Sequence, residues 1–103
     1  MWEIKETNIF QDWFLSLTDE KAALITRKIL TLKRLGNNAT IKQGSKSLGK
    51  SLFELRDKNM GLRAYYTFKG NKLIMLLNGG DKNTKKQQAK DIKLARKLLS
   101  ELE

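Results

Sequence analysis

The chain has 103 residues, of which 40% are hydrophobic and 31% are charged, with 21 Lys and Arg against 11 Asp and Glu. A chain of this length buries about 65% of its unfolded surface, so we expect a single domain over residues 1–103. Cysteine and histidine are absent, which excludes disulfides, thiolate chemistry and the commonest general base, and we expect neither a metal nor a cofactor.

The net charge of +10 is unevenly distributed. Residues 1–26 contain five acidic and two basic residues, whereas residues 27–63 contain ten basic and two acidic residues. A one-sided basic field concentrates polyanions, so nucleic acid is the expected partner, with a merely solvated surface as the alternative. No apolar run reaches the roughly 20 residues of a membrane span, and no secretory signal is visible, so we expect no membrane partner and a cytoplasmic location.

The N-terminal part predicts a short strand and then a helical hairpin. Residues 2–5 alternate in polarity, as in an edge strand. Large apolar residues then recur at the spacing of a short helix capped by Asn8: Phe10, Trp13, Phe14 and Leu17. A second helix is expected over residues 20–35, with Gly36 as its stop. Residues 39–50 predict a loop, in which Lys42 and Lys46 form either an electrostatic arm or an ordinary surface.

The stretch from residue 51 to residue 82 predicts a three-strand meander. Apolar and polar residues alternate in 52–57 and 61–69, which is typical of strands with one wet face, and Gly70-Asn71 is a hairpin signal. Residues 73–77 are apolar throughout, as in a strand covered on both faces. The alternation gathers four polar side chains on one side of the sheet: Glu54, Arg56, Arg63 and Tyr65.

Thr84 and Gln87 form a capping box that starts the last helix. Four lysines follow one face of this helix: Lys86, Lys90, Lys93 and Lys97. The predicted fold is therefore α+β, in the order β, α, α, β, β, β, α. It is a small, mostly antiparallel sheet, made of the N-terminal strand and the meander, with an α-hairpin and a C-terminal helix. We expect the helices to cover one face of the sheet, leaving the charged meander residues on a half-exposed face.

A series of short motifs occurs in one order along nearly the whole chain. They are Phe10, Trp13 and Leu17; Leu35-Gly36-Asn37; Phe53-Glu54-Leu55-Arg56; Gly61-Leu62-Arg63-Ala64-Tyr65-Tyr66; Leu76 to Thr84; and Asp91-Ile92 with Ala95. Each motif alone is common, but the ordered set resembles the RelE/ParE superfamily of type II toxins. It is most similar to the HigB-like branch of addiction module killer proteins.

The resemblance implies a toxin that is encoded beside a cognate antitoxin, which we expect to be of the helix-turn-helix type. RelE-type and HigB-type members cleave messenger RNA on the ribosome without a metal, whereas ParE-type members inhibit DNA gyrase. The resemblance further implies that Arg63 binds phosphate and that Lys82 is a basic catalytic residue. It implies RNA contacts from the strand that carries Arg56 and from the loop that precedes this strand.

Cleavage through the 2′-hydroxyl needs a proton acceptor, a proton donor and cations on the phosphate. Glu54 is a candidate acceptor, and Tyr65 is a candidate donor or a platform for base stacking. The proposed RNA contacts are Lys42, Lys46, Arg56, Lys86 and Lys90. Cross-strand ion pairs worth under about 1 kcal/mol each are the alternative reading of Glu54 and the arginines.

The expected activity is that of an endoribonuclease, an mRNA interferase that depends on the ribosome and inhibits translation. Its expected partners are the antitoxin, the ribosome and messenger RNA. Two other functions stay open on the sequence alone. One is a gyrase inhibitor of the same fold, and the other is a nucleic-acid-binding module without catalytic activity.

Overall fold

A computed structural model describes residues 1–36, 45–81 and 84–102. In chain order the elements are β1 (Glu3–Glu6), α1 (Asn8–Leu15), α2 (Asp19–Leu35), β2 (Ser45–Gly49), β3 (Leu52–Asp57), β4 (Leu62–Lys69), β5 (Leu73–Gly80) and α4 (Lys85–Leu102). The predicted α+β class and the order of the predicted elements are confirmed. The sheet has one strand more than expected, because part of the predicted loop is the strand β2.

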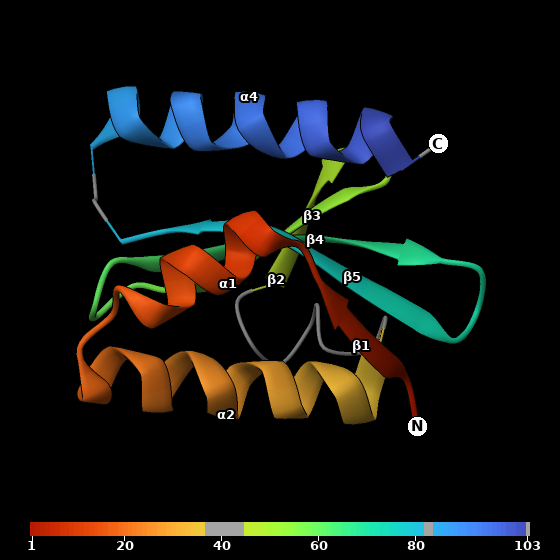
Figure 1. Cartoon of the computed structure of the whole chain (residues 1–103), viewed down its shortest axis with the longest axis horizontal. Helices are drawn as coiled ribbons and strands as arrows, with labels where there is room; N and C mark the ends of the chain where they lie inside the picture. Colours follow the sequence, from red (N-terminus) through yellow and green to blue (C-terminus); the bar gives the residue numbers. More distant parts are fainter. Residues whose placement is uncertain (37–44, 82–83, 103) are drawn as a thin grey trace.

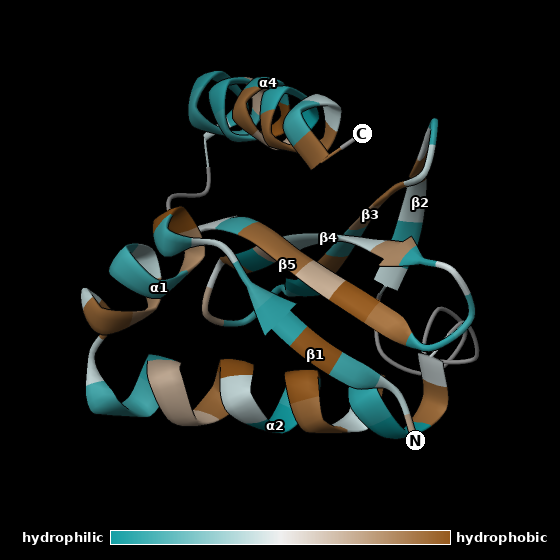
Figure 2. Cartoon of the chain, turned by 45° about the vertical axis from the view of Figure 1, so that its right-hand side comes forward, coloured by the Kyte–Doolittle hydropathy of each residue, from teal (hydrophilic) through white to brown (hydrophobic). Residues whose placement is uncertain are grey.

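The five strands form one sheet in the order β1-β5-β4-β3-β2. β1 runs parallel to β5, and the other three pairings are antiparallel. β5 contributes Ile74 and Leu76 to the core on one face of the sheet and Met75 and Leu77 to the core on the other, which explains the apolar run that colours much of its ribbon brown in Figure 2. The register shifts next to Tyr65, so that Leu76 pairs with Tyr66 while Asn78 pairs with Tyr65. Because of this bulge, two successive residues, Leu77 and Asn78, both direct their side chains toward α4.

The loop prediction for residues 39–50 is wrong at 45–49, where the chain adds an edge strand. β2 pairs with β3 in antiparallel register. Ser45 is buried, and its hydroxyl is hydrogen-bonded to that of Tyr66. Left-handed backbone at Gly49, Lys50 and Ser51 turns the chain into β3. Composition argued for a loop here because Gly, Ser and Lys are poor strand formers, but pairing with β3 overrides that preference.

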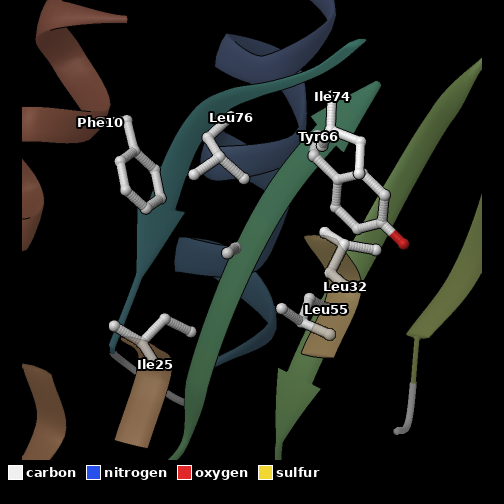
Figure 3. Packing of buried hydrophobic residues seen from close by; sticks show 8 residues of the cluster. Phe10, Ile25, Leu32, Leu55, Tyr66, Ile74 and Leu76 are labelled. Atoms are coloured by element: carbon white, nitrogen blue, oxygen red, sulfur yellow. The ribbon is translucent and has the colours of Figure 1, made fainter. Parts of the chain in front are cut away.

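Helices cover both faces of the sheet, so the prediction of a single covered face is wrong. α1 and α2 lie on one side and α4 lies on the other (Figure 1). The core under α1 and α2 contains the buried residues Phe10, Ile25, Leu32, Leu55, Ala64, Tyr66, Ile74 and Leu76 (Figure 3). A second core contains Leu52, Tyr65, Leu77 and Ala95, with α4 residues such as Ile92 and Leu99 packed against it. The face that was expected to be half exposed is therefore largely covered.

Side-chain caps set the helix starts. Thr7, and not Asn8, caps α1, because its Oγ1 accepts a hydrogen bond from the backbone N–H of Phe10. The predicted Thr84 cap is confirmed: its Oγ1 accepts from the N–H of Gln87 at 3.1 Å. Gly36 ends α2 with φ +56, in close approach to the ring of Trp2.

No helix among the described residues is long and apolar enough to cross a membrane.

Candidate anion-binding site

Four charged side chains from three neighbouring strands meet on the α4 side of the sheet. We call them the charged cluster, and they are Lys46 of β2, Glu54 and Arg56 of β3, and Arg63 of β4. Lys46 lies opposite Glu54 in the register, and Arg56 lies opposite Arg63. Strand alternation puts Glu54 and Arg56 on the same face as Leu52, which contacts α4. The predicted gathering of Glu54, Arg56 and Arg63 on one face is therefore confirmed.

Glu54 lies at the centre of the charged cluster. Its Oε1 accepts hydrogen bonds from Nε of Arg63 at 3.1 Å and from Nε of Arg56 at 3.3 Å. Its Oε2 lies 4.0 Å from Nζ of Lys46. One carboxylate is thus surrounded by three cations, so the charged cluster keeps two positive charges in excess. Such an excess of fixed cations favours an anion next to them.

Exposure within the charged cluster increases away from β4. Only 7% of the Arg63 side chain and 4% of the Glu54 side chain are exposed, against 27% for Arg56 and 55% for Lys46. An anion that arrives from solvent therefore meets Lys46 and Arg56 first, and Arg63 lies deeper in the charged cluster. Because a guanidinium is a planar fork, an arginine whose Nε is fixed presents its remaining N–H groups in a fixed direction.

Tyr65 shares this face but is completely buried. Its ring packs in the second core with Leu52, Leu77 and Ala95, so no nucleotide base can stack on it in this arrangement. Burial raises the pKa of its phenol far above the ordinary value, and the nearby Glu54 carboxylate raises it further. The phenol therefore stays protonated at neutral pH and cannot act as a general base.

The remaining predicted contacts lie away from this cluster or outside the described residues. Lys86 and Lys90 are exposed on α4, as are Lys93 and Lys97, on the helix face opposite the buried Ala95. Lys42 and Lys82 fall outside the described residues. Among the residues that are described, no three acidic side chains gather to hold a metal ion.

Two residues of α4 that were not predicted as site residues also make polar contacts. Arg96 of α4 donates from Nη2 to the carbonyl of Leu48 at 2.9 Å, and so ties the helix to β2. Asp91 of α4 lines a cavity of about 180 Å³ together with Trp13, Gly79, Gly80, Asp81 and Gln87. Burial raises the pKa of Asp91, although the hydrogen bond from Gln87 and the charge of Arg63 oppose this shift. In the sequence, Asp91 appeared only in the Asp91-Ile92 motif of the resemblance and as a negative charge among the lysines of a basic helix.

Comparison with known proteins places the chain in a family. The model of the family described as phage derived protein Gp49-like matches residues 12–100. An uncharacterised protein of Haemophilus influenzae is 40% identical over 102 residues, which is 97% of this chain and 95% of that protein.

Solved structures with the same fold include the isolated E. coli RelE toxin, with a TM-score of 0.69 and 10% identity over 90% of this chain and 97% of that one. A chain of the intact E. coli RelBE toxin–antitoxin complex gives a TM-score of 0.68 at 10% identity, over 82% of this chain and 100% of that one. At such low identity these matches establish a RelE-like fold and transfer no residue roles.

Proposed function

Because this chain belongs to the family of phage-derived Gp49-like proteins and has a RelE-like fold, we propose that it is the toxin of a type II toxin–antitoxin module. Its activity in this proposal is metal-independent cleavage of messenger RNA on the ribosome, as in the HigB-like branch, which stops translation in the cytoplasm. The single observation that supports the proposal best is the charged cluster, in which Arg56 and Arg63 are held side by side with two positive charges in excess.

The charged cluster suits the charge that develops when a 2′-hydroxyl attacks the neighbouring phosphate. The phosphorane carries more negative charge than the ground state, so fixed guanidinium groups stabilise the transition state more than the substrate. Arg56 and Arg63 are the proposed phosphate ligands, and Lys46 at the exposed rim adds to their field. Lys82, which follows Asp81 directly after β5, is the proposed acid or base.

The path of the RNA is proposed to follow exposed basic residues from the charged cluster over α4. Lys46 lies at the rim of the charged cluster, while Lys86 and Lys90 line the outer surface of α4. Lys42 of the segment before β2 is a further proposed contact. Each phosphate neutralised on a single strand contributes about −0.7 to the slope of log K against log salt, so binding should weaken steeply with salt.

The proposed protein partner is a cognate antitoxin, of the helix-turn-helix type, that covers the charged cluster with acidic side chains. E. coli RelE is found with its antitoxin in the RelBE complex. A chain with a net charge of +10 would otherwise attract polyanions without control. Co-purification from the native operon tests this partner, and protection of the acidic residues 1–26 alone would contradict the proposed mode of neutralisation.

Primer extension on a message translated in a cell extract tests the activity. Arg56→Ala should reduce the cleavage rate by about 10²–10³, the usual effect of removing one donor to a transition-state anion. Lys5→Ala is the matched control, because Lys5 is exposed on β1 at the opposite edge of the sheet and its loss changes the charge equally. Cleavage by Arg56→Ala at the wild-type rate would refute the proposed site, and gyrase inhibition without cleavage would establish the ParE-type alternative.

A further inference from the structure

Two arginines face each other directly across a strand pair. Arg56 of β3 and Arg63 of β4 are register partners, and the Cβ atoms of such partners lie about 5 Å apart. Like charges in this position repel and destabilise the sheet. Without a counter-charge the two guanidinium groups would therefore turn away from each other.

Glu54 supplies that counter-charge with a single oxygen. Its Oε1 accepts from Nε of Arg63 at 3.1 Å and from Nε of Arg56 at 3.3 Å, and only 3% of the residue is exposed. It reaches both arginines because it is two residues from Arg56 on the same strand and diagonal to Arg63 across the strand pair. The sheet register thus makes Glu54 the acceptor that brings the two forks to one point.

We propose that Glu54 is a positioning residue, which holds Arg56 and Arg63 side by side for one phosphate group, and not the proton acceptor of the reaction. The proposal rests on the proposed function, because it concerns how the charged cluster binds an RNA phosphate. A general base must aim a free lone pair at the hydroxyl that it deprotonates. Oε1 of Glu54 is occupied by two N–H donors, and Oε2 lies on the Lys46 side of this residue, which is only 3% exposed, so neither oxygen is open to a hydroxyl that arrives from solvent.

Charge and position have opposite consequences when Glu54 is neutralised. Glu54→Gln adds one positive unit to the net charge. If Glu54 only screens the arginines, this variant should therefore bind RNA more tightly than the wild type. If Glu54 positions the arginines, the same variant should bind RNA more weakly, because the two guanidinium groups repel each other and no longer converge. The amide oxygen of Gln still accepts a hydrogen bond, but a neutral acceptor holds a guanidinium much less strongly than a carboxylate does, so RNA binding should weaken about tenfold or more.

Two variants and one control separate these consequences. Glu54→Gln removes the charge, whereas Glu54→Asp keeps the charge on a shorter arm that cannot reach both arginines. Glu101→Gln, on an exposed position of the last turn of α4, makes the same charge change away from the charged cluster. Thermal melting selects the conditions under which each variant is folded.

Two measurements are made on each folded variant. The first is the affinity for a fluorescein-labelled single-stranded RNA oligonucleotide, by fluorescence anisotropy. The second is the ¹⁵N–¹H spectrum of the arginine Nε–H groups without RNA, in which hydrogen-bonded groups exchange slowly with water and give sharp signals. The spectrum reports on the two arginines whether or not the protein binds RNA.

The proposal expects two slowly exchanging Nε–H signals in the wild type and in Glu101→Gln, with at least one lost in each Glu54 variant. It also expects RNA affinity to fall about tenfold or more for Glu54→Gln and Glu54→Asp, and to rise slightly for Glu101→Gln. Retention of both signals in Glu54→Gln, or tighter RNA binding by it, would overturn the positioning role. A wild type with both signals but without RNA affinity would refute the proposed function, while the signals alone would still decide whether Glu54 orders the arginines.

Discussion

Replacing the buried ion pair between Glu54 and Arg63 should show strong energetic coupling. Arg63→Met leaves the buried Glu54 with Arg56 at 3.3 Å and Lys46 at 4.0 Å. We therefore expect the free energy of unfolding to fall by about 2–3 kcal/mol, which is less than the cost of a buried charge that has lost every partner. Glu54→Met leaves Arg63 buried and opposite a second arginine. Because the buried Arg63 then faces a second positive charge across the strand pair, the free energy of unfolding should fall by about 3–5 kcal/mol.

The double variant Glu54→Met/Arg63→Met removes both charges and fills the space with flexible apolar side chains. Because no buried charge is orphaned at these two positions, its loss should be smaller than the sum of the single losses by about 1–3 kcal/mol. In a domain of this size each kcal/mol corresponds to a shift of about 4–8 °C in Tm, so the coupling is readily measured.

Urea unfolding at neutral pH, with a common m value checked across the four proteins, measures the cycle. The two positions touch through a hydrogen bond of 3.1 Å, so additivity is not expected. If the double variant loses the sum of the two single losses within about 0.5 kcal/mol, the ion pair is energetically inert and the reasoning about burial fails. The same result would contradict the view that Arg63 is held by Glu54.

Three further outcomes follow from particular contacts. Gly79→Ala should lower the free energy of unfolding by about 1–3 kcal/mol, because its Cβ would lie 2.3 Å from the ring of Trp13. Gly80→Ala should lower it less, because its Cβ meets the movable carboxylate end of Asp91. Urea unfolding compares the two variants, and equal losses would contradict the packing. Burial raises the pKa of Asp91 in the folded protein above its value in the unfolded chain. The protonated carboxyl therefore stabilises the fold at low pH, and this contribution is lost as the pH rises through the folded pKa. The Tm of Asp91→Asn should rise relative to that of the wild type between about pH 3 and pH 7, and a Tm difference that does not depend on pH would refute this. Both tyrosines have pKa values raised by burial, so tyrosinate absorbance should appear only as circular dichroism reports alkaline unfolding, and a phenol that ionises in the folded protein near its ordinary pKa would contradict the burial.

Periodicity in the sequence determined the type and order of most elements. Alternation in β3 and β4 also determined that Glu54, Arg56 and Arg63 share a face, because successive side chains of a strand point to opposite sides. Local chemistry predicted the cap at Thr84, since its hydroxyl only needs an N–H three residues away. The Asn8 prediction failed by one residue because Thr7 offers the same kind of acceptor.

Only the tertiary structure decided what covers that shared face. The apolar stripe of α4 was visible in the sequence, but a stripe shows that a helix packs and not which face of a sheet receives it. Its placement over Tyr65 turned a predicted surface into a second core. The strand β2 likewise exists because Ser45 and Lys46 find partners on β3, which lies outside the reach of local propensity.

The bonds of Glu54 have the same origin. Sequence alternation placed a carboxylate near two arginines, and from that pattern a general base and a surface ion pair were both reasonable. Register then set Arg56 opposite Arg63 with Glu54 on the diagonal, and the burial of Glu54 and Arg63 excluded the water that would have screened them. Distances between strands and the dielectric around a charge are properties of the packed molecule, so the sequence alone could name these residues but could not assign the role of Glu54.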